Sequence, residues 1–205
     1  MIGIVDIGIG NLGSVREAIH ALGNDPVSVG RAADLEGLSH LILPGVGAFS
    51  HAVRRLHDTG LFGAIRQYAS DGRPLLGICL GMQLLADIGD EDGPSDGLGL
   101  IGGRVSLIAE RDRFRVPHVG WNEMRCPRPH PVLKGVRQGV DFYFVHSYEF
   151  QPTRRESVLG VTDHGKDIVC AVGQGSALGL QFHPEKSQKN GLRLLENFCD
   201  WDGRC

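Results

Sequence analysis

Residues 74–86, PLLGICLGMQLLA, contain the turn on which the fold depends. The apolar run at 74–78 predicts a short buried strand that leads into Cys79, and 82–86 predicts the start of a helix. Glycines two residues before and two residues after Cys79 form the pattern GxCxG, the sulfur counterpart of the GxSxG nucleophile elbow. In such a turn the glycines relieve crowding, and the following helix points its first amides toward the thiol. A buried structural cysteine between two turn glycines explains the pentapeptide equally well.

The chain before this turn alternates apolar runs with segments of helical spacing. Strands are predicted at 2–7, 26–30 and 40–43. Helices are predicted at 12–22 and 52–68. Ser14 is a candidate cap for the first helix, and Gly60 and Gly63 indicate a break in the second. This alternation of strand and helix predicts a parallel sheet covered by helices on both faces.

After about residue 97 the pattern changes to successive strands separated by turns. These strands are predicted at 105–109, 141–149, 157–162, 167–172 and 177–182. A closing helix is predicted at 191–198, and no internal repeat or Pro/Ser-rich linker marks a boundary. The sequence therefore predicts a single α/β domain over residues 1–205, with a mostly parallel open sheet, helices on both faces and a β-rich second half.

The bulk composition argues against several classes of function. A net charge of −3, with scattered Lys and Arg, provides no basic surface for nucleic acid. The sequence has no apolar run of about 18 residues and no signal-peptide pattern, so we expect a cytoplasmic protein without a membrane partner. The cysteines lack a CxxC pair and the histidines lack an HxxxH pattern, so neither a metal site nor a cofactor is expected. Cys126, Cys170, Cys199 and Cys205 are predicted to be ordinary thiols.

A second motif, QFHPE at 181–185, supplies a candidate base. Pro184 biases His183 toward an extended conformation, in which residues two apart project to the same side. Glu185 can then hold one ring nitrogen of His183 while the other nitrogen faces a thiol, which is the arrangement of a catalytic triad. A lone histidine is more often a surface or core residue, and only the combination with Cys79 favours the catalytic interpretation.

A third motif, LPGVGAF at 43–49, follows a predicted strand and precedes a helix. Its two glycines allow the backbone to turn an N–H toward a developing negative charge. The amides of Val46 or Gly47, together with that of Leu80, are therefore candidates for an oxyanion hole. By itself this segment is equally typical of a simple strand-to-helix turn, and it matches no nucleotide-binding glycine pattern.

The motifs PGVG, GICLGMQ and FHPE, in this order, resemble those of the class I (triad-type) glutamine amidotransferases, and the match spans almost the whole chain. DIGIGNLGSV (6–15), VPHVGWNE (116–123), FYFVHSYEF (142–150) and QFHPEKSQKNGLRLLENF (181–198) resemble in particular the glutaminase subunits of imidazole glycerol phosphate synthases, which act in histidine biosynthesis. The resemblance implies that Cys79 is the nucleophile, His183 the base and Glu185 the residue that orients it.

The resemblance also implies a substrate site and a partner. L-glutamine would be held by Gly45, Gln83, Glu91, Ser147 and Tyr148. Ammonia would pass to a barrel-type synthase (cyclase) subunit in a heterodimer, with Asn11, Trp121 and Asn122 facing that subunit.

Three alternatives stay open on the sequence. Similar amidotransferase subunits supply ammonia to a sugar-modifying synthase for surface polysaccharides, and Gly13 stands where the histidine-pathway subunit often has Arg. The elbow alone would also permit a cysteine peptidase or esterase, although GMQ and the His-Pro-Glu spacing favour an amidotransferase. A catalytically inactive binding module is the third, and the intact Cys, His and Glu argue against it.

Overall fold

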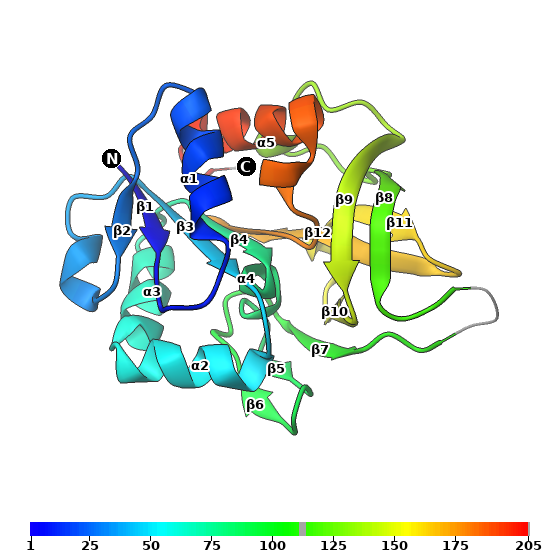
Figure 1. The fold of residues 1–205 in the computed structure, drawn as a ribbon, viewed down its shortest axis with the longest axis horizontal. Helices are drawn as coiled ribbons and strands as arrows, with labels where there is room; N and C mark the ends of the chain where they lie inside the picture. The colour runs from blue at the N-terminus through cyan, green and yellow to red at the C-terminus, as the bar shows by residue number, and fades with distance from the viewer. Residues whose placement is uncertain (111–113, 205) are drawn as a thin grey trace.

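A seven-stranded sheet forms the centre of the computed structural model, which describes residues 1–110 and 114–204 (Figure 1). Its strands, in spatial order, are β11 (Val158–Asp163), β12 (Asp167–Gln174), β13 (Ala177–Leu180), β4 (Leu75–Cys79), β3 (His40–Gly45), β1 (Ile2–Val5) and β2 (Val27–Val29). The five strands from β13 to β2 are parallel, and β11 and β12 extend the sheet in antiparallel fashion. The predicted α/β class with a mostly parallel sheet is confirmed.

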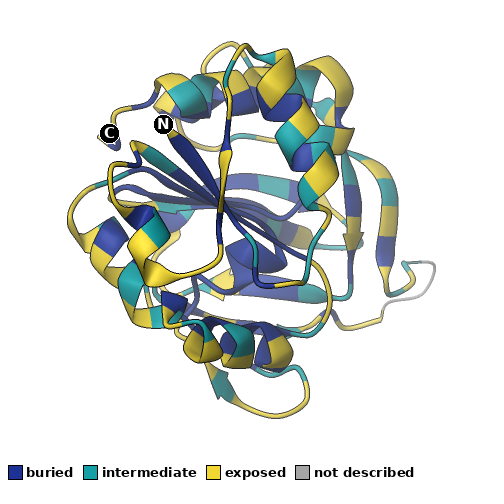
Figure 2. Ribbon diagram, turned by 60° about the vertical axis from the view of Figure 1, so that its left-hand side comes forward, coloured by how far each residue is buried: buried dark blue, intermediate teal, exposed yellow. Residues whose placement is uncertain are grey.

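Helices cover both faces of this sheet. They are α1 (Leu12–Ala21), α2 (Phe49–Asp58), α3 (Leu61–Ser70), α4 (Leu80–Gln83) and α5 (Gln188–Asp200). Figure 1 shows α1 and α5 on one side and α2 and α3 on the other. Successive side chains of β3 alternate between the two layers: Leu41 and Leu43 pack with α2 and α3, whereas Ile42 packs with α1 and α5. The central strands are therefore buried on both faces, which explains their unbroken apolar runs (Figure 2).

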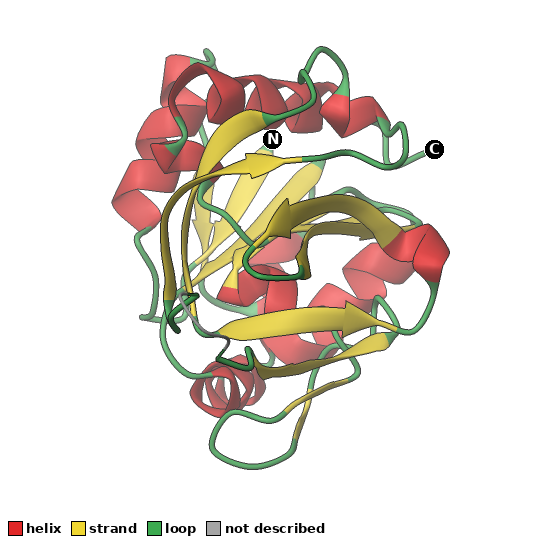
Figure 3. Ribbon diagram, turned by 90° about the vertical axis from the view of Figure 1, so that its right-hand side faces the viewer, coloured by secondary structure: helices red, strands yellow, loops and turns green. Residues whose placement is uncertain are grey.

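The second half adds two smaller sheets on the side seen in Figure 3. A four-stranded sheet has the order β10 (Tyr148–Pro152), β7 (Gly103–Leu107), β5 (Ile88–Gly89) and β6 (Ser95–Asp96). An antiparallel ribbon pairs β8 (His118–Met124) with β9 (Val140–His146). The single strand predicted at 141–149 is wrong, because the chain leaves the ribbon at Ser147 and enters the other sheet as β10. Strands β5, β6 and β8 were not predicted.

Short 3₁₀ helices complete the fold: η1 (Ala32–Leu35), η2 (Pro131–Leu133), η3 (Arg155–Ser157) and η4 (Pro184–Lys186). Two sequence predictions need local correction. The segment at 52–68 forms two helices, because Gly60 adopts a left-handed conformation (φ 70°) and starts α3 in a new direction. Asn11, rather than Ser14, caps α1, since its side chain accepts a hydrogen bond from the Ser14 amide (3.4 Å).

The structure also bears on the predictions about membrane spans and cysteines. Within residues 1–110 and 114–204, no helix is long and apolar enough to cross a membrane. Cys79, Cys126, Cys170 and Cys199 are free cysteines. Cys205, the remaining predicted thiol, lies outside the described residues.

Candidate active site

Cys79 stands at a sharp turn between the end of β4 and the start of α4. Its backbone has a φ of 55° and a ψ of −111°, a conformation that costs a residue with a side chain on the order of 1–3 kcal/mol. The turn brings backbone segments so close that a Cβ on Gly81 would lie 1.7 Å from the Leu43 carbonyl oxygen, and a Cβ on Gly77 would lie 2.4 Å from the Gly81 oxygen. The flanking glycines are therefore required by this turn, and such strained geometry is typical of a nucleophile.

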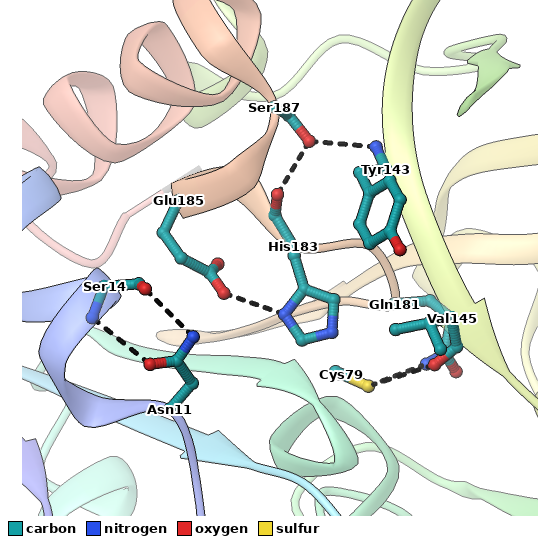
Figure 4. A network of polar contacts seen from close by, with 9 residues as sticks. All are labelled: Asn11, Ser14, Cys79, Tyr143, Val145, Gln181, His183, Glu185 and Ser187. Carbon is teal, nitrogen blue, oxygen red and sulfur yellow. Dashed lines mark hydrogen bonds and ion pairs between the residues drawn. The ribbon is translucent and has the colours of Figure 1, made fainter. Parts of the chain in front are cut away.

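His183 and Glu185 form a buried pair beside this cysteine. Nδ1 of His183 lies 2.8 Å from Oε1 of Glu185, and the two side chains are 4% and 1% exposed. The other ring nitrogen, Nε2, is buried without a hydrogen-bond partner among the described residues, and Figure 4 shows the ring between Glu185 and Cys79. Burial alone would lower the pKa of His183, but Cys79 and Glu185 beside the ring outweigh it and raise this pKa to about 9. The surroundings of the ring therefore favour the protonated imidazole.

Ser187, which the sequence analysis did not single out, fixes the segment that carries His183. Its hydroxyl donates to the His183 carbonyl (2.7 Å) and accepts from the Tyr143 amide (3.0 Å). The His183 amide in turn donates to the Tyr143 carbonyl (2.9 Å). These three bonds tie His183 to β9, and Figure 4 shows the two that involve the Ser187 hydroxyl. The available signal was a serine close behind a His-Pro turn, where hydroxyls often bond to the local backbone.

A cavity of about 470 Å³ opens in front of Cys79. This volume lies within the usual range for small-molecule sites. It is lined by Val46, Gly47, Ala48, Cys79, Leu80, Gln83, Glu91, Pro117, Val145, His146, Ser147, Tyr148 and His183. The structure thus brings together all the predicted oxyanion residues and all the predicted substrate residues except Gly45. That glycine sits behind the wall, where a Cβ would come within 3.1 Å of the Leu80 Cβ.

Gln83 and Glu91 are both held by the protein at the cavity wall. Nε2 of Gln83 donates to the Tyr148 carbonyl (3.3 Å) and to Oε1 of Gln181 (3.0 Å). Oε2 of Glu91 accepts from the Phe49 amide at the start of α2 (2.7 Å), and burial raises the pKa of this carboxyl. The remaining oxygen of each side chain has no hydrogen-bond partner among the described residues and is available to a ligand.

The candidate oxyanion donors come from the loop after β3 and from the first turn of α4, which meet at the cavity. Val46 is 43% exposed and Gly47 has a φ of 94°, just after β3. Leu80 is the first residue of α4, so its amide has no acceptor within the helix. Over the residues that the structure describes, no group of three or more His, Cys, Asp or Glu side chains is arranged to hold a metal ion.

The predicted partner residues lie in different surroundings. Asn11 is exposed and caps α1. Trp121 is 48% exposed on the outer face of the β8–β9 ribbon, where Val119 and Val145 form a cross-strand pair beside it. Asn122 points to the opposite side of β8 and donates to Nε2 of His118 (3.1 Å) and to the Asp163 carbonyl (2.8 Å). Of the last two predicted residues, only Trp121 therefore offers its side chain on the outer face.

Comparison with known proteins identifies the family of this chain. The family described as glutamine amidotransferase class-I matches residues 5–201. The imidazole glycerol phosphate synthase subunit HisH of Geobacillus kaustophilus (strain HTA426) is 47% identical over 202 residues, covering 97% of this chain and 95% of that protein. HisH of Moorella thermoacetica (strain ATCC 39073 / JCM 9320) is 44% identical over 197 residues, covering 96% and 93%.

Solved structures share the fold at lower identity. A glutamine amidotransferase superimposes with a TM-score of 0.77 at 23% identity, covering 97% of each chain. A glutamine amidotransferase from Thermotoga maritima gives a TM-score of 0.69 at 19% identity, covering 97% of this chain and 82% of that one. The chain therefore belongs to the class I glutamine amidotransferase family and, within it, is a relative of the HisH subunits of imidazole glycerol phosphate synthase.

Proposed function

We propose that this chain is the glutaminase subunit of an imidazole glycerol phosphate synthase and hydrolyses L-glutamine to glutamate and ammonia for histidine biosynthesis. Its relation to HisH subunits supports the pathway. The observation that carries the chemistry is that Cys79 and His183 line one cavity while Glu185 holds Nδ1 of His183 from behind. Membership of the amidotransferase family also makes a peptidase or esterase activity the weaker interpretation.

Cys79 is the proposed nucleophile, His183 the acid and base, and Glu185 the residue that orients His183. The sulfur attacks the side-chain amide carbon of glutamine, and a carbon–sulfur bond forms as the carbonyl oxygen becomes an oxyanion. The carbon–nitrogen bond then breaks, and the proton on His183 Nε2 goes to the departing ammonia. Water, deprotonated by His183, attacks the resulting thioester and releases glutamate and the thiolate.

The amides of Val46 or Gly47 and of Leu80 are the proposed oxyanion donors. Val46 and Gly47 follow β3, Leu80 begins α4, and all three line the same cavity as Cys79, so donors from both segments can approach the same oxygen. Gln83 and Glu91, with Ser147 and Tyr148, are the proposed contacts for the amino-acid portion of glutamine. Glu91 suits the α-ammonium group, since one of its carboxylate oxygens is already fixed by the Phe49 amide.

The proposed partner is the cyclase subunit, a barrel-type protein with which this chain forms a heterodimer. The relatives are named as subunits of a synthase, and that name supports an assembly of this kind. We place the contact at the exposed apolar face of the β8–β9 ribbon around Trp121, together with Asn11. Residues 1–205 are proposed to act as one glutaminase domain in the cytoplasm.

Gly13, the residue on which the surface-polysaccharide alternative rests, is not dictated by the fold. A Cβ on this residue would have no heavy atom within 4 Å, so the fold accepts a larger side chain at this position. Glycine is therefore not a structural requirement here. The 43–47% identity to HisH subunits supports the histidine pathway as the one that receives the ammonia.

The test is to measure glutamate production from glutamine by the chain alone and with the cyclase subunit and its ribonucleotide substrate. We expect stimulation by that partner. In the complex, Cys79→Ala should abolish glutamine-dependent synthesis and spare synthesis supported by free ammonia. Stimulation only by a sugar-pathway synthase would reassign the acceptor, and glutaminase activity that survives Cys79→Ala would refute the nucleophile.

A further inference from the structure

Gln181 is a buried polar residue to which neither the sequence motifs nor the proposed mechanism gives a role. It follows β13, two residues before His183, and its side chain is shielded from solvent (0% exposed). Its Nε2 lies 3.8 Å from Sγ of Cys79, within hydrogen-bonding range for sulfur (Figure 4). A fully buried amide that contacts the reacting atom calls for an explanation in terms of the reaction.

The orientation of this amide is fixed by its neighbours. The Tyr148 carbonyl can only accept, so the Gln83 atom 3.3 Å from it must be the NH₂ group. The same NH₂ group lies 3.0 Å from Gln181, so the Gln181 atom facing it must be the oxygen. The other end of the Gln181 amide, which faces Cys79, is therefore the donor.

His146 strengthens this assignment from the other side of the Tyr148 carbonyl. Its Nδ1 lies 2.8 Å from that oxygen and must carry the proton, so its Nε2 accepts. His118 Nδ1, 3.0 Å away, must then donate to it, and His118 Nε2 accepts from Asn122. Burial lowers the pKa of His118 to about 3 and that of His146 to about 4, so both rings are neutral, as these roles require. Every donor in the hydrogen-bond network between Asn122 and Cys79 is thus matched to an acceptor.

We propose that Gln181 is a further catalytic residue, which donates a hydrogen bond from Nε2 to Sγ of Cys79 whenever that sulfur carries negative charge. An amide N–H does not ionise, so Gln181 moves no proton and leaves acid–base chemistry to His183. The uncharged thiol has a different partner, the Val145 carbonyl, 3.9 Å from Sγ. Gln181 therefore favours the thiolate over the thiol.

The bond acts at two points of the reaction and rests on the proposed function of Cys79. It stabilises the thiolate before attack on glutamine. It acts again when the thioester carbon–sulfur bond breaks and the electron pair returns to sulfur. Substrate binding does not involve this donor, because Gln181 lies behind Gln83 and is absent from the cavity wall.

The test is Gln181→Met, which keeps the length of the side chain and removes the donor. Alkylation of Cys79 by iodoacetamide is followed against pH by peptide mass spectrometry, which separates it from the other cysteines. We expect the midpoint of the pH–rate profile to rise by about one pH unit, since a hydrogen bond to a charged group is worth on this order. The kcat for glutamine in the complex with the cyclase subunit should fall about tenfold, with KM changed less than about twofold.

Asn122→Leu is the matched control, because it removes a partly buried amide at the far end of the same network. It should leave the alkylation midpoint in place. If Gln181→Met does not fold, Gln181→Asn replaces it as the test variant, because its side chain is one methylene shorter and holds the amide farther from the sulfur. The proposal is overturned if a folded Gln181 variant has the same midpoint of Cys79 alkylation as the wild type. A wild-type complex without glutaminase activity would instead overturn the proposed glutaminase function.

Discussion

Replacing Glu185 with glutamine tests the buried pair at the centre of the site. The amide keeps the length of the side chain and an oxygen for Nδ1 of His183, but it removes the negative charge. In the structure the two groups are 2.8 Å apart and almost fully shielded from solvent, so water does not screen their interaction. The substitution should therefore change the protonation of His183 with little change of shape.

The size of the effect follows from the pKa of His183. A rise from 6.5 to about 9 favours the imidazolium by on the order of 3 kcal/mol, at ~1.36 kcal/mol per unit. Cys79 and Glu185 both contribute to this rise against the cost of burial. Removing the charge of Glu185 should therefore lower the pKa of His183 by at least about one unit. His183 then becomes a weaker base toward Cys79 and water, and this loss together with looser ring orientation should lower the glutaminase kcat by about 100-fold.

Two measurements check this prediction. The titration of His183 is followed by ¹⁵N NMR of the labelled imidazole, and glutamine-dependent and ammonia-dependent synthesis are compared in the complex. Ammonia-dependent synthesis is the internal control, because it does not use the triad. The reasoning is refuted if the folded Glu185→Gln variant titrates like the wild type and keeps glutaminase activity within about threefold.

Other consequences concern stability. Gly81→Ala should lower the free energy of unfolding, measured in urea, by more than about 4 kcal/mol, since its Cβ would lie 1.7 Å from the Leu43 carbonyl oxygen. Gly13→Ala, which has open space around it in α1, should instead raise this free energy by about 0.5–1 kcal/mol. Equal effects of the two substitutions would contradict the steric argument. Asn11→Ala should lower the unfolding free energy by about 0.5–1 kcal/mol by removing the cap of α1, and no change would mean that this long bond contributes nothing. The raised pKa of His183 stabilises the fold fully below pH 6.5, and this contribution should disappear as the pH rises through about 9; unfolding curves across that range that do not weaken would count against the ion pair.

The parts of the fold that could be predicted are those specified by local sequence. Strands β3 and β4 are buried on both faces, so each reads as a continuous apolar run. The turn at Cys79 is marked by two glycines that the backbone contacts require. The pairing of His183 with Glu185 was also predictable. The two residues flank Pro184, so their side chains can meet without any contact from a distant part of the chain.

The parts that escaped prediction depend on distant partners. The stretch FYFVHSYEF has no glycine or proline to mark a break at Ser147, yet β9 pairs with β8 and β10 pairs with β7. The neighbouring strand with which a segment pairs decides where that segment ends. A single sequence does not reveal which strand this is. Gln181 was missed for the same reason, since its orientation is set by Gln83, a residue 98 positions away.

The site itself is a consequence of strand order. Strands β3, β4 and β13 are parallel neighbours, with Gly45 opposite Cys79 and Leu180 opposite Ile78. The carboxyl ends of parallel strands meet at one edge of a sheet, so the loop after Gly45, the turn at Cys79 and the segment leading to His183 converge there. The sequence predicts three motifs that follow strands, but their meeting requires β13 to lie beside β4. One residue inserted after Leu180 would keep all three motifs intact and still displace His183 from Cys79, so activity depends on this register as much as on the motifs.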